Sequence, residues 1–184
     1  MIAARAEPPG PTGGLRTAAA RRKRTLPMNT LISPLQLLKL AFREGEYLPP
    51  ETFGEADIAA AEQRYIVPVI GPELHEKLLA GDHADFRNTY LAAPLALFTR
   101  LALQPRLDIR TGQCGTTAPK SSWSQPADDE ARLRHRHALR CEARTLLRRA
   151  SDYLENNRDE FPEYRPEKNI FNRCMTDGGF VQVR

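Results

Sequence analysis

Apolar residues at helical spacing, divided by prolines and glycines, predict a series of short helices over residues 57–104. The most informative stretch is Asp57–Gly81, DIAAAEQRYIVPVIGPELHEKLLAG. Within it, Ile58, Ala61 and Tyr65 recur at intervals that place them on one helical face. We expect Pro68 to end this helix within a residue or two, because proline lacks an amide donor and restricts the residue before it.

A second helix is expected directly after the first. Gly71 favours a helix stop and Pro72 suits a first helical turn, so this helix begins there and runs to Gly81. The two helices are expected to form a rigid corner that places no catalytic group.

An earlier helix is indicated by Ser33 and Pro34, because serine caps free backbone amides and proline fits the first turn. The residues that follow give an apolar stripe that ends at Gly45. The stripe consists of Leu35, Leu38 and Phe42.

The segment Asp85–Gln104 is apolar on most of its circumference beyond Tyr90. A helix of that kind is buried either in the core of the chain or in a subunit interface. Pro94 is expected to kink this helix or to mark a second start. After it, we expect Leu107–Ile109 to form a short extended segment.

The longest predicted helix covers Asp128–Arg158, about 45 Å at the α-helical rise per residue. Its first turn carries three carboxylates, which interact favourably with the helix dipole. Pro162 lies just beyond its end. One face is apolar and consists of Leu139, Ala143, Leu146, Leu147, Ala150, Tyr153 and Leu154.

Two segments lack helical periodicity. Thr111–Gln125 is a polar loop, and loops of this length inside a compact domain are usually functional or mobile. Trp123 near its end is expected to anchor the loop. Ile170–Arg184 predicts a small hairpin that turns at Asp177-Gly178-Gly179. The predicted fold is mainly α: a small helical bundle with one long C-terminal helix, a long polar loop and a minor C-terminal β-hairpin.

Length and charge indicate one domain with a basic tail. The chain has 184 residues, enough for a single core. Residues 1–27 hold six basic residues and one acid, whereas the remainder holds 21 basic and 22 acidic residues. We expect this tail to be disordered when isolated, or not to be translated at all if Met28 is the initiator. The helical domain then spans residues 28–184. The basic cluster in the tail, a candidate nucleic-acid contact, consists of Arg21, Arg22, Lys23 and Arg24.

The cysteines suggest no catalytic site. They are odd in number and form no CxxC pair, which indicates a reducing compartment rather than a disulfide framework. Local spacing places no base near Cys141. No apolar run reaches the roughly 20 residues that a bilayer span needs, so no membrane contact is expected. The three cysteines are Cys114, Cys141 and Cys174.

The histidines have no ligand spacing and are interpreted as solvated residues on helix surfaces. His135 and His137 are two positions apart, which on a helix points them in different directions. His75 and His83 flank Gly81 without a carboxylate at ligand spacing. We expect no enzyme, no cofactor and no metal site. A weaker alternative is an enzyme whose site forms around Cys114 or His75.

Residues 132–149 carry seven arginines and a single acid, Glu142. Three of the arginines recur every four residues and form a stripe beside the apolar face: Arg140, Arg144 and Arg148. Such a stripe contacts DNA phosphates, contacts acidic side chains of a neighbouring subunit, or is plain solvated surface. Arg132 and Arg136 are further candidate nucleic-acid contacts.

Several short motifs carry a family resemblance. They are residues 61–66 (AEQRYI), residues 68–71 (PVIG) and the leucines at 74, 78 and 79, continued by the apolar helix and the glycine-containing loop that follow. On these residues the chain from about Met28 resembles the small helical head–tail connector (adaptor) proteins of tailed bacteriophages and prophages. More narrowly, it is similar to uncharacterised phage-type proteins of Bacteroides-like hosts.

The resemblance implies a structural virion protein without an active site. Such a protein forms a ring under the portal and extends the DNA channel towards the tail. Its partners would be copies of itself, the portal protein and tail-side proteins, with DNA passing through without sequence-specific binding. It would reside at the head–tail junction of the virion, and in the host cytoplasm during assembly.

The resemblance also suggests where the contacts lie. The long loop, with Lys120 and Trp123, would reach a neighbouring subunit or the portal. A channel that lets DNA slide avoids strong phosphate binding, so the stripe of Arg140, Arg144 and Arg148 is expected at the subunit seam. The alternative function is a DNA-binding helical protein that uses the Arg132–Arg149 face.

Overall fold

The computed structural model describes residues 30–42, 46, 48, 52–108, 110–112, 115–117, 127–173, 176–177 and 180–181. Side chains are described for all of these except residues 108–117 and those beyond 173. The predicted basic tail over residues 1–27 lies outside this part of the chain. So do Cys114, Lys120, Trp123 and Cys174.

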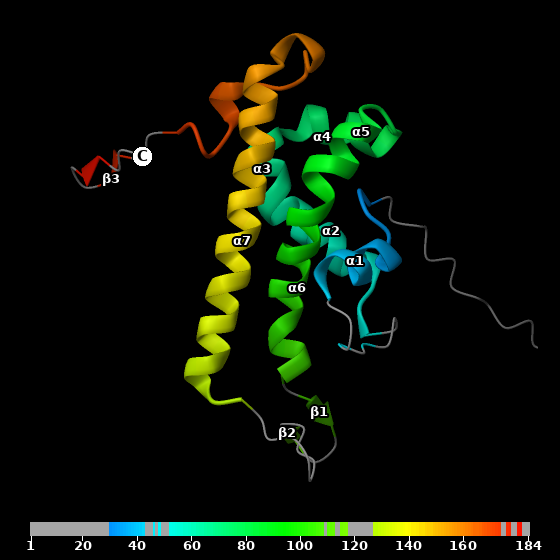
Figure 1. Cartoon of the computed structure of the whole chain (residues 1–184), viewed down its shortest axis with the longest axis vertical. Coiled ribbons are helices and arrows are strands. Elements are labelled where there is room, and N and C mark those ends of the chain that lie inside the picture. Colours follow the sequence, from blue (N-terminus) through cyan, green and yellow to red (C-terminus); the bar gives the residue numbers. More distant parts are fainter. Residues whose placement is uncertain are drawn as a thin grey trace, which may run out of the picture.

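Two long antiparallel helices, α6 (Ala92–Asp108) and α7 (Asp129–Asn156), lie side by side along the length of the molecule (Figure 1). On the side of α6 away from α7, α1 (Pro34–Ala41) and α2 (Glu55–Ala61) pack against it. Residues 94–101 of α6 are therefore buried on every side. The apolar circumference of this helix is thus covered within the chain itself.

Short helical segments lead from α2 to α6. Neither Pro68 nor Pro94 interrupts the helix in which it lies. In chain order the segments are η2 (Glu62–Ile66), α3 (Val67–Ile70), α4 (Pro72–Ala80), α5 (Ala84–Phe86) and η3 (Arg87–Leu91). Both η2 and η3 are π-helical turns.

The helix ends two residues after Pro68, at Ile70, as predicted, but the proline itself does not end it, because a π-turn precedes the proline. A proline in a regular α-helix clashes with the carbonyl four residues earlier. In η2 the amide of Val67 instead donates to the carbonyl of Glu62, five residues back, and the helix continues through α3. A π-turn contains one residue more than an α-helical turn, and here this wider turn accommodates the proline that follows it. The same device, η3, precedes Pro94, and there too the helix continues.

The predicted stops at glycine are confirmed. Gly71 separates α3 from α4 with φ of 88° and ψ of 156°, a region that side chains strongly disfavour. Pro72 then opens α4, and Gly81 ends it in the left-handed conformation with φ of 104°.

Gly71→Ala is expected to lower the free energy of unfolding by about 1–3 kcal/mol, the usual cost of a backbone conformation reserved for glycine. The cause is conformational alone, because an added Cβ at Gly71 meets no atom within 4 Å. Gly54→Ala is the control for backbone conformation, since Gly54 has φ of −128°; because Gly54 is the N-cap of α2, where alanine is disfavoured, its loss is expected to be about 0.5–1 kcal/mol. Urea denaturation measures both, and equal losses in the two variants would contradict this explanation.

Helix α1 begins as predicted but turns a different face to the core. Gln36 N–H donates to the Ser33 hydroxyl and the Gln36 side chain accepts from the Ser33 amide, a complete capping box. The buried residues are Leu37 and Ala41, however, whereas Leu35 is 67% exposed. The predicted stripe is therefore wrong at Leu35, although its other two members pack partly against the core.

Helix α7 follows the prediction closely. The Asp128 side chain caps it by accepting from the amide of Ala131 at 2.7 Å. Of the predicted apolar face, five residues are buried and Leu146 and Tyr153 are partly buried. After Asn156 the chain enters a 3-10 turn, η4 (Arg158–Glu160), and later a second one, η5 (Pro166–Lys168).

The remaining elements are short strand pairs. β1 (Arg110–Gly112) pairs with β2 (Gly115–Thr117), and β3 (Thr176–Asp177) pairs with β4 (Phe180–Val181), both antiparallel. The extended segment predicted over residues 107–109 was wrong for its first two residues, which still belong to α6. The hairpin predicted over residues 170–184 stays a prediction, because residues 170–172 form a turn and much of the rest lies outside the described chain. Across the described residues, no helix has both the length and the apolar character of a membrane span.

Candidate functional site

A groove lies between α7, the η2–α3 segment and the turn that follows η5, and it encloses about 330 Å³. Its aromatic wall is formed by Tyr65 and Phe98, whose rings stack at 4.2 Å with an interplanar angle of 8°. Phe98 is buried and fixed in the core, so it holds the ring of the half-buried Tyr65 in place. We call this hollow the arginine groove, for the three cations described next.

Three arginines line the groove: Arg64 from η2, and Arg140 and Arg144 from α7. All three are exposed, and among the described residues none of them forms an ion pair with a carboxylate. The guanidinium of Arg64 lies 5.3 Å from the centre of the Tyr65 ring. One turn beyond Arg144, the guanidinium of Arg148 lies 5.9 Å from the Phe171 ring. Positive charge and aromatic surface therefore meet at one place.

The far wall of the groove is held by a buried asparagine. Asn169 is fully buried, and its amide nitrogen donates to the Ser151 hydroxyl and to the Tyr164 hydroxyl, each at 2.7 Å. Its carbonyl oxygen accepts from the amide of Phe171 at 2.9 Å. Burial raises the pKa of Tyr164, so this phenol stays neutral as an acceptor. The amide of Ile170 also donates to the carbonyl of Pro68 at 3.0 Å, which ties the turn to α3.

This arrangement suits an anionic group next to an apolar one. Guanidinium groups form their strongest hydrogen bonds with carboxylates and phosphates. A flat aromatic wall favours an apolar or ring-shaped side chain. The groove therefore has the chemistry of a docking site for an acidic segment that carries an apolar residue.

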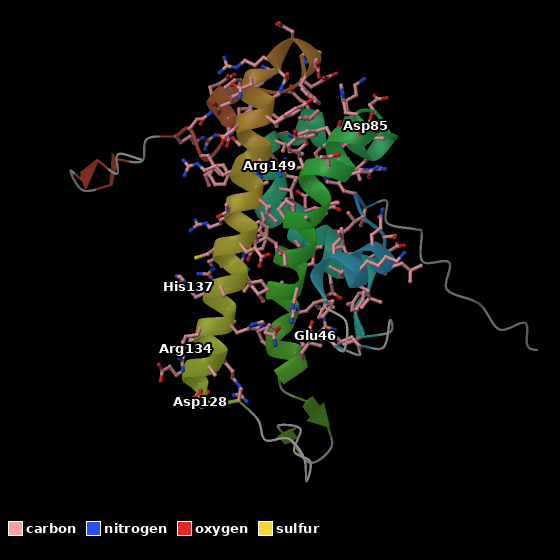
Figure 2. The ribbon with its side chains drawn as sticks, viewed as in Figure 1. Glu46, Asp85, Asp128, Arg134, His137 and Arg149 are labelled. Atoms are coloured by element: carbon pink, nitrogen blue, oxygen red, sulfur yellow. The ribbon has the colours of Figure 1, made fainter. Side chains whose placement is uncertain are left out.

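The other arginines of residues 132–149 do not line the groove, and Arg136 lines a separate hollow together with Arg140. Arg132 lies 3.3 Å from Asp129, and Arg134 lies 3.6 Å from Glu130. Figure 2 shows Arg134 on the side of α7 turned away from α6. The guanidinium of Arg149 lies 5.3 Å from the ring of Tyr90, in the segment that leads into α6. The contact predicted for the Arg132–Arg149 face stays a prediction, and Arg140, Arg144 and Arg148 are the part of that face that lies at or next to the groove.

The opposite charge gathers where the chain turns back beyond the end of α7 (Figure 1). We call residues 159–163, Asp-Glu-Phe-Pro-Glu, the acidic corner. Phe161 anchors the corner, because it is buried with its ring centre 5.1 Å from that of Phe86 and 4.6 Å from that of His83. Asp159, Glu160 and Pro162 are exposed. Within the described chain neither Asp159 nor Glu160 forms an ion pair.

The segment after the acidic corner is clamped to α4. Glu73 accepts from the guanidinium of Arg165 at 2.9 Å and from the ammonium of Lys168 at 3.4 Å. The hydrogen bond from Arg165 lowers the pKa of Glu73 from its ordinary value. Together with the aromatic anchor, this clamp fixes the corner in one orientation.

Comparison with known families finds one match, which covers most of this surface. A family described as "Family of unknown function (DUF6712)" matches residues 66–172. The chain belongs to this family. The DUF6712 match covers α7, the acidic corner and the Asn169 turn, while Arg64 and Tyr65 lie directly before it. No curated protein and no solved structure matches the chain.

Glu62, just before the DUF6712 range, and His75, inside it, form a buried pair that the sequence analysis missed. Glu62 is 2% exposed and His75 is 6% exposed, and His75 Nε2 lies 3.2 Å from Glu62 Oε2. The other oxygen of Glu62 accepts from the amide of Leu31 at 2.7 Å. The interpretation of His75 as a solvated surface residue was therefore wrong. A signal was present, because Glu62 lies four residues from both Ile58 and Ile66 on the buried face.

The prediction that no base lies near Cys141 was also wrong. His137, one helical turn earlier on α7, places Nδ1 at 3.6 Å and Nε2 at 3.7 Å from Cys141 Sγ. Both side chains are exposed, and Figure 2 shows His137 on the side of α7 away from α6. In the part of the DUF6712 chain that the structure describes, no three His, Cys, Asp or Glu residues gather as metal ligands.

A buried arginine joins α6 to α1, on the side of α6 away from α7. Arg100 is 8% exposed, and it donates to the carbonyl of Ala41 and, at 2.8 Å, to the carboxylate of Glu46. Its guanidinium also lies 4.6 Å from the centre of the Phe42 ring. Arg100 thus ties the end of α1 to α6, a structural role that the apolar pattern of this segment concealed.

Proposed function

We propose that this protein is a structural head–tail connector of a tailed phage or prophage, which assembles into a ring under the portal and extends the DNA channel. The observation that carries the proposal is that the chain exposes two patches of opposite charge, one along α7 and one just beyond the end of α7. The stripe of Arg140, Arg144 and Arg148 lacks carboxylate partners among the described residues, and so do Asp159 and Glu160 of the acidic corner. Ring subunits need two different complementary surfaces of this kind.

The stripe fits a subunit seam better than a channel wall. Arginines that face a lumen would bind phosphates and slow the passage of DNA. At a seam the same side chains meet carboxylates of the neighbouring copy. The family resemblance of residues 61–79 adds to this argument. The apolar character of α6 does not, because that helix is covered inside the chain.

The alternative function is DNA binding by the same stripe. Exposed arginines without carboxylate partners favour phosphate contacts as well as protein contacts. A DNA-binding protein would show affinity for duplex DNA that falls steeply with salt, by close to one power of the salt concentration per phosphate contact.

Light scattering after size-exclusion chromatography tests the proposal on the full chain. Rings, or a concentration-dependent series of species that leads to them, are expected, and negative-stain images should display the ring. A chain that stays monomeric up to high concentration and binds duplex DNA tightly at physiological salt would replace the connector by the DNA-binding alternative.

Arg144→Glu is expected to weaken self-association at least about tenfold, because it places a carboxylate where the neighbouring copy offers carboxylates. Arg134→Glu is the matched control, with the same change of charge on the same helix but outside the groove. It should leave association within about twofold of the unsubstituted chain, since exposed ion pairs contribute little. Unchanged assembly of Arg144→Glu together with lost DNA binding would reverse the ranking of the two functions.

A further inference from the structure

The acidic corner complements the arginine groove in chemistry. At the corner, the exposed Pro162 comes two residues after the exposed Glu160, while Glu163 is partly buried and lies 4.0 Å from the ammonium of Lys77. In the groove, the stacked rings of Tyr65 and Phe98 are accompanied by arginines. The corner thus offers an apolar ring with exposed acids, and the groove offers an aromatic wall with guanidinium groups. Aromatic-lined grooves are a common binding site for proline.

We infer that the corner of one copy docks into the arginine groove of the next copy. This inference rests on the proposed ring, and it names the contact that would hold the ring together. Pro162 packs against the aromatic wall, while the exposed carboxylates of Asp159 and Glu160 pair with the arginines of the groove. The occupant of the groove is therefore a second copy of this chain.

The contact is between molecules because the two patches of one chain are too far apart. Arg144 and the end of α7 at Asn156 are separated by 12 residues, about 18 Å along the helix. The corner lies beyond that end and is fixed there by Phe161, so it cannot fold back onto its own groove.

The two patches are different surfaces, and unlike patches associate with either of two symmetries. Repeated head-to-tail copies of the contact close into a ring when the rotation allows, whereas a two-fold dimer makes the contact twice, with each copy placing its corner in the groove of the other. The proposed ring requires the head-to-tail arrangement, and the mass from light scattering distinguishes the two.

Charge exchange between two variants tests the contact. Arg144→Glu alters the groove and Glu160→Arg alters the corner, and each variant alone should associate at least about tenfold more weakly than the unsubstituted chain. An equimolar mixture should recover assembly, because the altered groove of one variant accepts the altered corner of the other and the unaltered patches pair as before. Light scattering of the three samples and of the unsubstituted chain gives the comparison.

Matched controls separate the contact from folding and from net charge. Arg134→Glu on α7 and Glu167→Arg on η5 make the same charge changes outside groove and corner, and should assemble as the unsubstituted chain does. Circular dichroism confirms that each variant is folded. Their mixture should behave like either one alone.

The outcomes distinguish this inference from the proposed function. Rings that form normally with Glu160→Arg, or single variants that stay dissociated when mixed, would overturn the corner-in-groove contact and leave the ring itself standing. Absence of self-association in the unsubstituted chain would overturn both. Assembly that is lost in each single variant and recovered in their mixture would establish the contact. If Arg144→Glu weakened only DNA binding, the groove would belong to nucleic acid instead.

Discussion

Glu62→Ala is expected to lower the free energy of unfolding by about 3–5 kcal/mol, a larger effect than any exposed charge of this chain would have. The carboxylate is buried, and it accepts from the amide of Leu31 at 2.7 Å while its other oxygen lies 3.2 Å from His75 Nε2. Its removal leaves both groups buried without a partner, and unsatisfied buried groups carry their full desolvation penalty.

Urea denaturation followed by circular dichroism measures this loss. Glu76→Ala is the control, because Glu76 is an exposed acid on α4 one position after His75. It should change the free energy of unfolding by no more than about 0.5 kcal/mol. A Glu62 variant as stable as the Glu76 variant would mean that Leu31 and His75 are satisfied by water, and that the buried carboxylate does not hold residues 30–32 to the bundle.

Leu154→Ala is expected to cost about 2–5 kcal/mol, the range for a cavity left by a fully buried leucine. Leu154 is 0% exposed at the end of α7 that carries the acidic corner. Leu133→Ala, on the same helix but 63% exposed, should cost no more than about 0.5 kcal/mol. Thermal unfolding of both variants makes the comparison. Similar losses in the two would show that Leu133 is covered in the assembled protein or that α7 packs differently.

Local signals in the sequence predict where the helices begin and end. Ser33 and Asp128 are capping residues by their side-chain chemistry, and both accept from amides of the first turn. Gly71 and Gly81 occupy conformations with positive φ that other residues disfavour. These features depend only on neighbouring residues, so they can be identified without knowledge of the tertiary structure.

The orientation of helix faces was less predictable, because it depends on distant contacts. Leu35 belongs to a plausible apolar stripe, yet α1 turns Leu37 and Ala41 inward. The segment before α1 is held by Glu62, which lies 31 residues away. The end of the helix near Pro68 was predicted, but its cause was not, because the π-turn that accommodates the proline is seen only in the structure.

The candidate site was predictable only in part. The spacing of Arg140 and Arg144 identified the charged stripe. The aromatic wall combines Tyr65 with Phe98, from two different helical segments, and the far wall depends on the buried hydrogen bonds of Asn169. No local pattern brings such residues together, so the groove emerges only from the packing of α7 against η2 and α3.

The two π-turns have a consequence for how the chain tolerates changes of length. A π-turn holds one residue more than an α-turn, and one residue corresponds to a rotation of about 100° around a helix. Across η3 the buried residues recur after five positions, from Phe86 to Leu91, and across η2 from Ala61 to Ile66, with the buried Glu62 between them. Each turn is equivalent to a single-residue insertion that the helix has absorbed. Deletion of one residue there would restore a regular α-helical turn, and the side chains before and after it would keep the faces that they present now.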